Sequence, residues 1–354
     1  MKELLKTLAL ECAPSGREKA VAKLIEKEIA PYCDSVTYDK IGNLIAVIKP
    51  RRKCERVMLC AHMDEVGFMV KSIDNDGRAH IVILGNAETR TLSGRRVRFL
   101  DGMVGIVSTK PLHVMSSNEE ERPTYEDRLY IEFGAKNRAE AETMVKIGDF
   151  GTFEPKFTPL AGETYAGKAI GGRACVASLI SLVKETHAAK KAKTLQKECY
   201  FVFSVKREIV RKLFAVETAA FNIRPQTALV LDAAPVCDYY EKDEKEQEIG
   251  AVCGAGIVLS PADSRTMYDR ALFASAVTLC ETEGIAYQYP RSAAMEGNES
   301  GSIHKSAEGV RTLSVGLPTR NLHSGAEIIK YRDLEAVNTF VKAWLLSNED
   351  EKKG

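Results

Sequence analysis

The pattern of apolar residues changes twice along the chain, and this change constrains the fold more than any other feature. In residues 1–66, and again in residues 160–354, short apolar runs alternate with stretches of helical periodicity. Between them, residues 67–159 hold strand-like runs and turns with few helical stretches. The alternation predicts an α/β fold with a doubly wound, mixed sheet covered on both faces, and the middle stretch predicts an inserted β-rich domain.

Both parts have a definite set of expected elements. Apolar runs predict buried strands, and a period near 3.6 residues predicts helices. Ser15 and Glu18 have the spacing of a capping box at the start of the second helix, and the turn Asp74–Gly77 predicts a hairpin. The expected strands are residues 43–48, 57–61, 199–205, 227–232 and 310–317, with 68–73, 80–84, 97–99, 104–108 and 129–133 in the insert; the expected helices are residues 1–12, 15–29, 173–187, 210–221, 264–283 and 334–346.

Charge and cysteine content exclude several classes of function. Lys and Arg number 50 against 49 Asp and Glu, and no clustered basic stripe is visible, so we expect no nucleic-acid partner. No apolar run is long enough to span a bilayer, and Glu3 and Glu11 interrupt the first apolar segment, which argues against a signal peptide. The nine cysteines include no C-x-x-C pair, which favours reduced thiols and a cytoplasmic location.

Two polar residues stand where expected strands end. His62 follows an apolar run, and Asp64 is placed to hold the second nitrogen of its imidazole. Taken alone, His62 is more often a hydrogen-bonded structural histidine than a metal ligand. Asp232 ends another apolar run, where a carboxylate is costly unless it is paired or bound to metal, although a capping role is equally compatible.

Two further positions complete a possible site. Arg207 and Glu208 follow the expected strand 199–205, and His323 lies in a loop after the last expected strand. Each taken alone is most often a solvent-exposed turn or loop residue. Together with His62 and Asp232 they supply the residue types of a His/carboxylate zinc site, at the strand ends where doubly wound folds bind ligands.

The order of several motifs resembles the glutamyl-aminopeptidase family, some of whose members carry the older name endoglucanase M. One of them, Ala61–Gly67, matches the H-x-D-E-x-G motif of the family. The resemblance implies an α/β sheet of zinc-aminopeptidase type, with residues 67–159 as a small β-barrel-like domain that pairs subunits. The motifs are Pro14–Glu18, Asp39–Leu44, Ala61–Gly67, Ser93–Val97, Gly105–Pro111, Ile147–Gly151, Leu322–Ser324 and Tyr331–Asp333.

The same resemblance implies an activity and a set of partners. Family members release N-terminal residues from peptides with two divalent ions, zinc or cobalt, and assemble from dimers into dodecamers. By resemblance, His62 and Asp232 would bind one ion, Glu208 and His323 would bind the other, and Asp64 would orient His62.

The chain departs from this pattern at two essential positions. A K-A-L-D-D-R-like segment reads Lys168–Arg173 here, with Gly171 at the position of the Asp that bridges both ions. The general-base position of the Glu-Glu pair holds Arg207, which stays protonated and cannot accept a proton. Without the bridge each ion would keep two protein ligands, fewer than catalytic zinc sites use, so we expect at most one weakly bound ion. We expect Arg207 to pair with Glu208 or Asp232 instead.

Two interpretations of function follow from these changes. In the first, the chain is an impaired or inactive aminopeptidase; in the second, it is a working enzyme with a rebuilt or single-metal site. The second interpretation requires a carboxylate such as Glu65 or Glu299 to enter the site, or an alignment shifted by one residue at Arg207. Hydrolysis of β-glucan would need a pair of carboxylic acids flanking a sugar, for which the sequence carries no signal.

Overall fold

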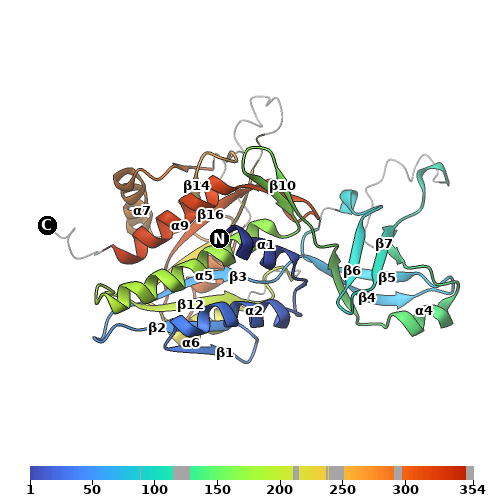
Figure 1. The fold of residues 1–354 in the computed structure, drawn as a ribbon, viewed down its shortest axis with the longest axis horizontal. Coiled ribbons are helices and arrows are strands. Elements are labelled where there is room, and N and C mark those ends of the chain that lie inside the picture. The colour runs from blue at the N-terminus through green and yellow to red at the C-terminus, as the bar shows by residue number, and fades with distance from the viewer. Residues whose placement is uncertain are drawn as a thin grey trace.

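The chain forms a mixed eight-stranded sheet with helices on both faces, next to a closed six-stranded barrel (Figure 1). The structure is a computed structural model, and it describes residues 1–87, 89–114, 128–209, 215–236, 238, 251–290 and 297–347. These two bodies confirm the predicted fold class. No helix within the described ranges has both the length and the apolar character that crossing a membrane requires.

The sheet is parallel at its centre and has antiparallel pairs on both sides of it, and its last two strands, at one edge, pair in parallel. Its four central strands run parallel, β12 next to β3, then β13 and β16. The sequences of these four strands contain nearly continuous apolar runs, which are typical of strands buried on both faces. In order across the sheet, the strands are β1 (Ser35–Tyr38), β2 (Leu44–Ile48), β12 (Glu198–Ser204), β3 (Arg56–His62), β13 (Thr227–Pro235), β16 (Arg311–Thr319), β14 (Ile257–Leu259) and β15 (Tyr287–Gln288).

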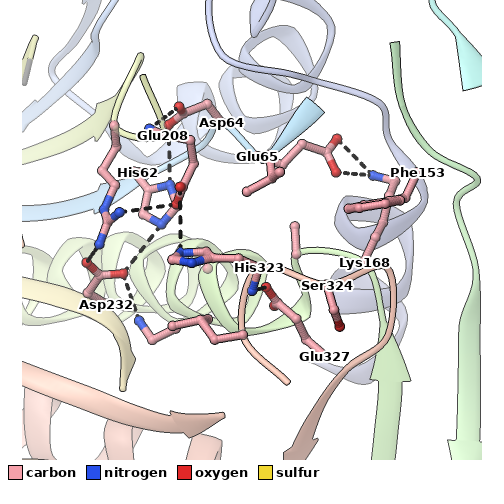
Figure 2. A pocket seen from close by; sticks show the side chains of 16 residues that line it. His62, Asp64, Glu65, Phe153, Lys168, Glu208, Asp232, His323, Ser324 and Glu327 are labelled. Carbon is pink, nitrogen blue, oxygen red and sulfur yellow. Dashed lines mark hydrogen bonds and ion pairs between the residues drawn. The ribbon is translucent and has the colours of Figure 1, made fainter. Parts of the chain in front are cut away.

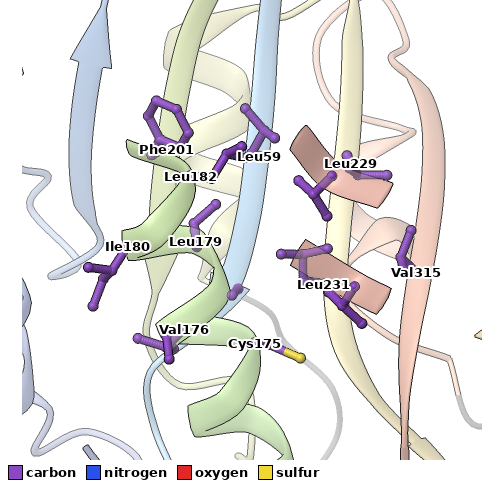
Figure 3. Close-up of a cluster of buried hydrophobic side chains, with 14 of the residues drawn as sticks. Leu59, Cys175, Val176, Leu179, Ile180, Leu182, Phe201, Leu229, Leu231 and Val315 are labelled. Carbon is purple, nitrogen blue, oxygen red and sulfur yellow. The ribbon is translucent and has the colours of Figure 1, made fainter. Parts of the chain in front are cut away.

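One long helix, α5 (Ile170–Lys191), organises the packing on one face. Its apolar side chains meet Leu59 of β3, Phe201 of β12 and Leu229 of β13 (Figure 3). Fifteen of its 22 residues are buried, because α1, α2 and α9 cover its outer side. Full burial of each Leu or Phe contributes about 1.5–3 kcal/mol. The covering helices are α1 (Lys2–Leu10), α2 (Lys19–Ile29), α7 (Arg270–Glu283) and α9 (Tyr331–Leu346), whereas α6 (Val216–Ile223) and α8 (Ser300–Ile303) cover the other face.

The barrel is built only from antiparallel pairs and has its own apolar core. The predicted hairpin is present, with the turn held by Asp74, whose carboxylate accepts the N–H groups of Asp76 and Arg78. Closure leaves no open strand edge. Around the barrel the strands are β4 (Gly67–Ile73), β5 (Ala79–Leu84), β8 (Tyr130–Glu132), β7 (Val104–Ser108), β6 (Arg96–Phe99) and β9 (Phe150–Phe153), with α4 (Arg138–Met144) before β9.

A small third sheet leads from the barrel back to α5. Its order is β10 (Phe157–Leu160), β11 (Thr164–Gly167) and β17 (Glu327–Lys330). Because β11 runs into the start of α5 and β17 follows the loop of His323, their pairing brings these two connections together. The barrel strands lie within residues 67–153. The division into domains at residues 66 and 160 stays a prediction.

Two expected elements differ from the structure, and a third is described only in part. Ser15 does not cap the second helix; α2 begins at Lys19, and the Glu18 carboxylate accepts the N–H groups of Gly16 and Lys206 instead. The helix expected over 264–283 begins at Arg270, where the Asp269 side chain accepts the N–H of Leu272. Of the helix expected over 210–221, residues 210–214 lie outside the described residues.

Candidate active site

The residues predicted as metal ligands lie together in one pocket at the carboxyl ends of the parallel strands (Figure 2). His62 is the last residue of β3 and pairs in register with Ser204 of β12, so Arg207 and Glu208 follow just beyond it. Asp232 comes from β13, and His323 comes from the loop between β16 and β17. The convergence arises because parallel strands end at the same edge of a sheet.

His62 lies between two carboxylates. Its Nδ1 is 3.3 Å from Oδ1 of Asp64, and its Nε2 is 3.4 Å from Oδ1 of Asp232. The other oxygen of Asp64 accepts the backbone N–H of Glu208 at 2.8 Å, which ties β3 to the segment after β12. Burial opposes a charge on the imidazole, but the two carboxylates outweigh it and raise the pKa of His62 well above its ordinary value.

Arg207 forms ion pairs with both of the carboxylates that face it. One guanidinium nitrogen lies 3.3 Å from Glu208 Oε1, and another lies 3.2 Å from Asp232 Oδ2. The side chain of Arg207 is only 8% exposed, so these pairs are shielded from solvent. Burial alone would raise the pKa of Asp232, but Arg207 and His62 reverse that effect and lower it below its ordinary value.

The loop of His323 is held by a carboxylate that the sequence analysis missed. Glu327 is buried, and its two oxygens accept the N–H of His323 and the N–H of Gly171, each at 3.0 Å. Burial raises the pKa of Glu327 to about 7. The His323 ring lies 3.6 Å from Glu208 Oε2. The only signal in the sequence was an acidic residue four positions after His323, at the start of a strand.

The carboxylates considered as replacements are engaged elsewhere. Glu65 borders the pocket, but it receives Lys168 Nζ at 2.7 Å, Arg173 at 3.4 Å and the N–H of Ala13, all in a buried cluster. Glu299 does not line the pocket; it lies 3.3 Å from the Cys60 sulfur. Burial raises the pKa of Glu299 to about 7.

The two glycines of Lys168–Arg173 face different neighbours. A Cβ at Gly171 would stand 2.7 Å from Thr319 Oγ1 and 2.8 Å from the Ala233 Cβ. A Cβ at Gly172 would stand 3.0 Å from Nε2 of His62. Gly172 lines the pocket, and Gly171, the predicted bridging position, does not. Neither position accepts a side chain unless its neighbours move.

The donor set does not fit a two-metal centre in this conformation. Within the part of the chain that the structure describes, no three His, Cys, Asp or Glu side chains are arranged to hold a metal ion. Arg207 already engages oxygens of Glu208 and Asp232. The cavity left between the side chains is about 20 Å³, enough for about one water molecule. The arrangement is a buried cluster of compensating charges with little room for a substrate.

Comparison with known proteins places the chain in a family. A family model described as M42 glutamyl aminopeptidase matches residues 42–340. The chain belongs to the M42 glutamyl aminopeptidase family. This membership confirms the resemblance seen in the motifs, and it implies an aminopeptidase scaffold from a family that uses divalent metal ions.

Relatives of known name or structure match this M42 chain over nearly its whole length. The lysyl aminopeptidase of Pyrococcus furiosus is 28% identical, covering 97% of this chain and 96% of the relative. The glutamyl aminopeptidase of Lactococcus lactis is 25% identical, with 96% and 94% covered. The structure of a TET aminopeptidase from a marine sediment archaeon of the Thaumarchaeota superposes with a TM-score of 0.90 at 26% identity, covering 99% and 97%. The Pyrococcus horikoshii TET1 peptidase, which can assemble into a tetrahedron or a large octahedral shell, gives 0.84 at 27%, covering 97% and 98%.

Proposed function

We propose that this chain is an M42-family protein in which Arg207 takes the place of the metal charge, and that it releases N-terminal residues from peptides very slowly or not at all. The observation that carries the proposal is the pair of contacts from Arg207 to Glu208 and Asp232, at 3.3 and 3.2 Å. By resemblance these two carboxylates would serve different metal ions. A single guanidinium therefore stands between the two proposed metal positions.

Burial of the cluster explains why a fixed cation is needed there. Two buried carboxylates without a partner are strongly destabilising, and removing one member of a buried pair typically costs about 3–5 kcal/mol. Arginine suits this role because it stays protonated and presents several N–H donors in one plane. The same property prevents Arg207 from activating water as a general base.

A working aminopeptidase with a rebuilt, single-metal site is the second candidate. The observation that favours it is Glu327, a carboxylate in the same pocket as His323 and Glu208. In the present conformation both oxygens of Glu327 accept backbone N–H groups. Glu327 would have to give up at least one of these bonds to bind an ion, so the first candidate is preferred.

We further propose that the barrel, residues 67–159, pairs subunits in a homo-oligomer. Large apolar side chains stand exposed on it, among them Leu100 at 42%, Met144 at 40% and Ile147 at 63%. Contact with another subunit would remove such side chains from water. The TET1 relative, which can assemble into a tetrahedron or a large octahedral shell, supports the same proposal.

We also propose a cytoplasmic location, because the eight cysteines that the structure describes are all free thiols.

Metal content and turnover together test the proposed function. The protein would be purified without chelator, incubated with zinc or cobalt and desalted, and its metal content measured by mass spectrometry. The same sample would be assayed on a panel of aminoacyl nitroanilides and short peptides, with the Pyrococcus furiosus lysyl aminopeptidase as the positive control. We expect fewer than one ion per chain and no release above background. Two ions per chain, or turnover comparable to the control, would overturn the proposal.

A further inference from the structure

A second groove lies at the end of α5 that is farther from the candidate site. Helix α5 starts at Ile170, beside the pocket, and ends at Lys191. At a rise of about 1.5 Å per residue the helix is about 33 Å long, so its far end lies well away from the candidate site. There the loop between β2 and β3 lies beside the end of the helix (Figure 1). The groove between them has a volume of about 720 Å³, within the range of small-molecule sites.

The lining of this groove is strongly basic. Arg51 and Arg52 come from the loop, whereas Lys191 and Lys193 come from the end of α5 and the turn after it. None of these four side chains makes an ion pair or hydrogen bond with any described residue, and no carboxylate lines the groove. Lys190 also lines it, but its ammonium is paired with Asp34. Four cationic side chains that have no partner among the described residues therefore face one concave surface.

An ordinary structural role accounts for only part of this charge. Basic residues in the last turn of a helix are favoured by the partial negative charge of the helix C-terminus, which explains Lys190 and Lys191. It does not explain Arg51 and Arg52, which reach the same groove from a separate segment. Like charges brought together in this way repel each other, and a bound anion would remove the repulsion. The two basic runs, 51–53 and 190–193, are far apart in the sequence and gather only in the fold.

We propose that the groove binds a compact anion carrying at least two phosphate groups. Arginine is suited to phosphate because its planar fork donates two parallel hydrogen bonds, and lysine adds point charge. The described lining contains no Phe, Tyr or Trp on which a base could stack, which is the usual device for holding single-stranded nucleic acid. The ligand is therefore recognised through clustered phosphates and not through a nucleobase or an extended backbone.

Binding of inorganic tripolyphosphate, followed by titration calorimetry at about 0.15 M salt, tests the proposal. The groove variant Arg52→Glu/Lys191→Glu is compared with Lys71→Glu/Lys146→Glu, which changes the net charge equally at exposed sites on the barrel side of the molecule. We expect the groove variant to bind about tenfold more weakly or worse, and the control to stay within about twofold of the wild type. The neutral variant Arg52→Gln is expected to fall between them, and it replaces the double variant if that protein does not fold.

Two further ligands test which chemical class of anion the groove recognises. ATP, which has the same triphosphate, is expected to bind no more tightly than tripolyphosphate, and a trinucleotide with its phosphates spread along the backbone is expected to bind more weakly. No tripolyphosphate binding by the wild type would overturn the proposal, as would equal weakening in the two double variants. A preference for ATP or the trinucleotide would show that a base or an extended strand is recognised instead.

Discussion

Replacing Arg207 by methionine removes the charge of the guanidinium and keeps much of the apolar stem. The variant removes the guanidinium that pairs with both Glu208 and Asp232, since the contacts at 3.3 and 3.2 Å are lost, and Asp232 keeps only His62 as a charged partner among the described residues. Breaking a buried pair in this way costs about 3–5 kcal/mol. With an unfolding entropy of about 2.1 cal/mol/K per residue over 354 residues, the expected fall in Tm is ~4–7 °C in metal-free buffer.

The same variant is expected to gain a response to zinc. Once Arg207 no longer engages Glu208 and Asp232, a divalent ion can supply the missing charge. Zinc at a concentration of about 100 times its Kd would raise the free energy of unfolding of the variant by about 2.7 kcal/mol, which restores about 4 °C of the lost Tm. Wild-type protein is expected to show no zinc-dependent rise, because Arg207 already neutralises the carboxylates. Differential scanning calorimetry with and without zinc measures both effects.

Arg173→Met is the matched control for this experiment. Arg173 is also buried and lies 3.4 Å from Glu65, in the neighbouring cluster with Lys168. Its loss is expected to lower Tm without creating a response to zinc, because Lys168 remains as a partner for Glu65. Zinc stabilising the wild type as much as Arg207→Met, or an Arg207→Met protein as stable as the wild type without metal, would refute the reasoning.

Three other changes test separate parts of the structure. Glu299 has a pKa raised to about 7 in the fold, so the folded state binds this proton more tightly than the unfolded chain does. The contribution of the protonated carboxyl to the free energy of unfolding is therefore complete below pH ~4.5 and is lost as the pH rises to about 7. Glu299→Gln is therefore expected to be more stable than the wild type by about 3 kcal/mol at pH ~8 and similar to it at pH ~4.5, by urea denaturation; a gain that does not change with pH would contradict this. Gly171→Asp and Arg207→Glu are each expected to stay inactive in the nitroanilide assay. Measurable turnover is expected only when both are combined with Thr319→Ala, which removes the 2.7 Å contact, and with a shift of the backbone that relieves the remaining 2.8 Å contact with the Ala233 Cβ. Activity in either single variant would show that bridge and base do not act as a unit. Ile147→Glu places a charge on the exposed face of the barrel and is expected to lower the mass measured by light scattering, and an unchanged mass would exclude this face from the interface.

The sequence was sufficient to predict the fold and the place where polar residues gather. The short apolar runs within Leu44–Ile48 and Thr227–Asp232 predict buried strands, because runs of this length bounded by polar residues are typical of strands covered on both faces. The carboxyl ends of parallel strands then bring His62 and Asp232 to one edge. These inferences depend on backbone geometry that any α/β sheet shares.

Other parts of the candidate site and the basic groove depend on tertiary packing, which a local sequence pattern does not predict. Glu327 could not be singled out, because its role is to accept N–H groups from two loops that meet only through the pairing of β11 with β17. The choice between Gly171 and Gly172 required the direction of each Cα–Cβ bond at the start of α5. The basic groove was invisible in the sequence because its charges come from segments more than a hundred residues apart.

The substitutions at the candidate site balance one another in charge. Relative to the two-metal pattern that the family resemblance implies, the loss of two divalent ions removes four positive charges. Gly171 and Gly172, in place of the two Asp of the K-A-L-D-D-R-like segment, restore two of them, and arginine in place of the base Glu restores the other two. Protonation of His62, whose pKa is raised by Asp64 and Asp232 against the effect of burial, adds one further positive charge between those two carboxylates. On our proposal, each change taken alone would leave a buried charge without a partner, which costs several kcal/mol. On this proposal the two glycines, Arg207 and a charged His62 form one electrostatic unit, and a variant that reverses only one of them is expected to lose stability before it regains any chemistry.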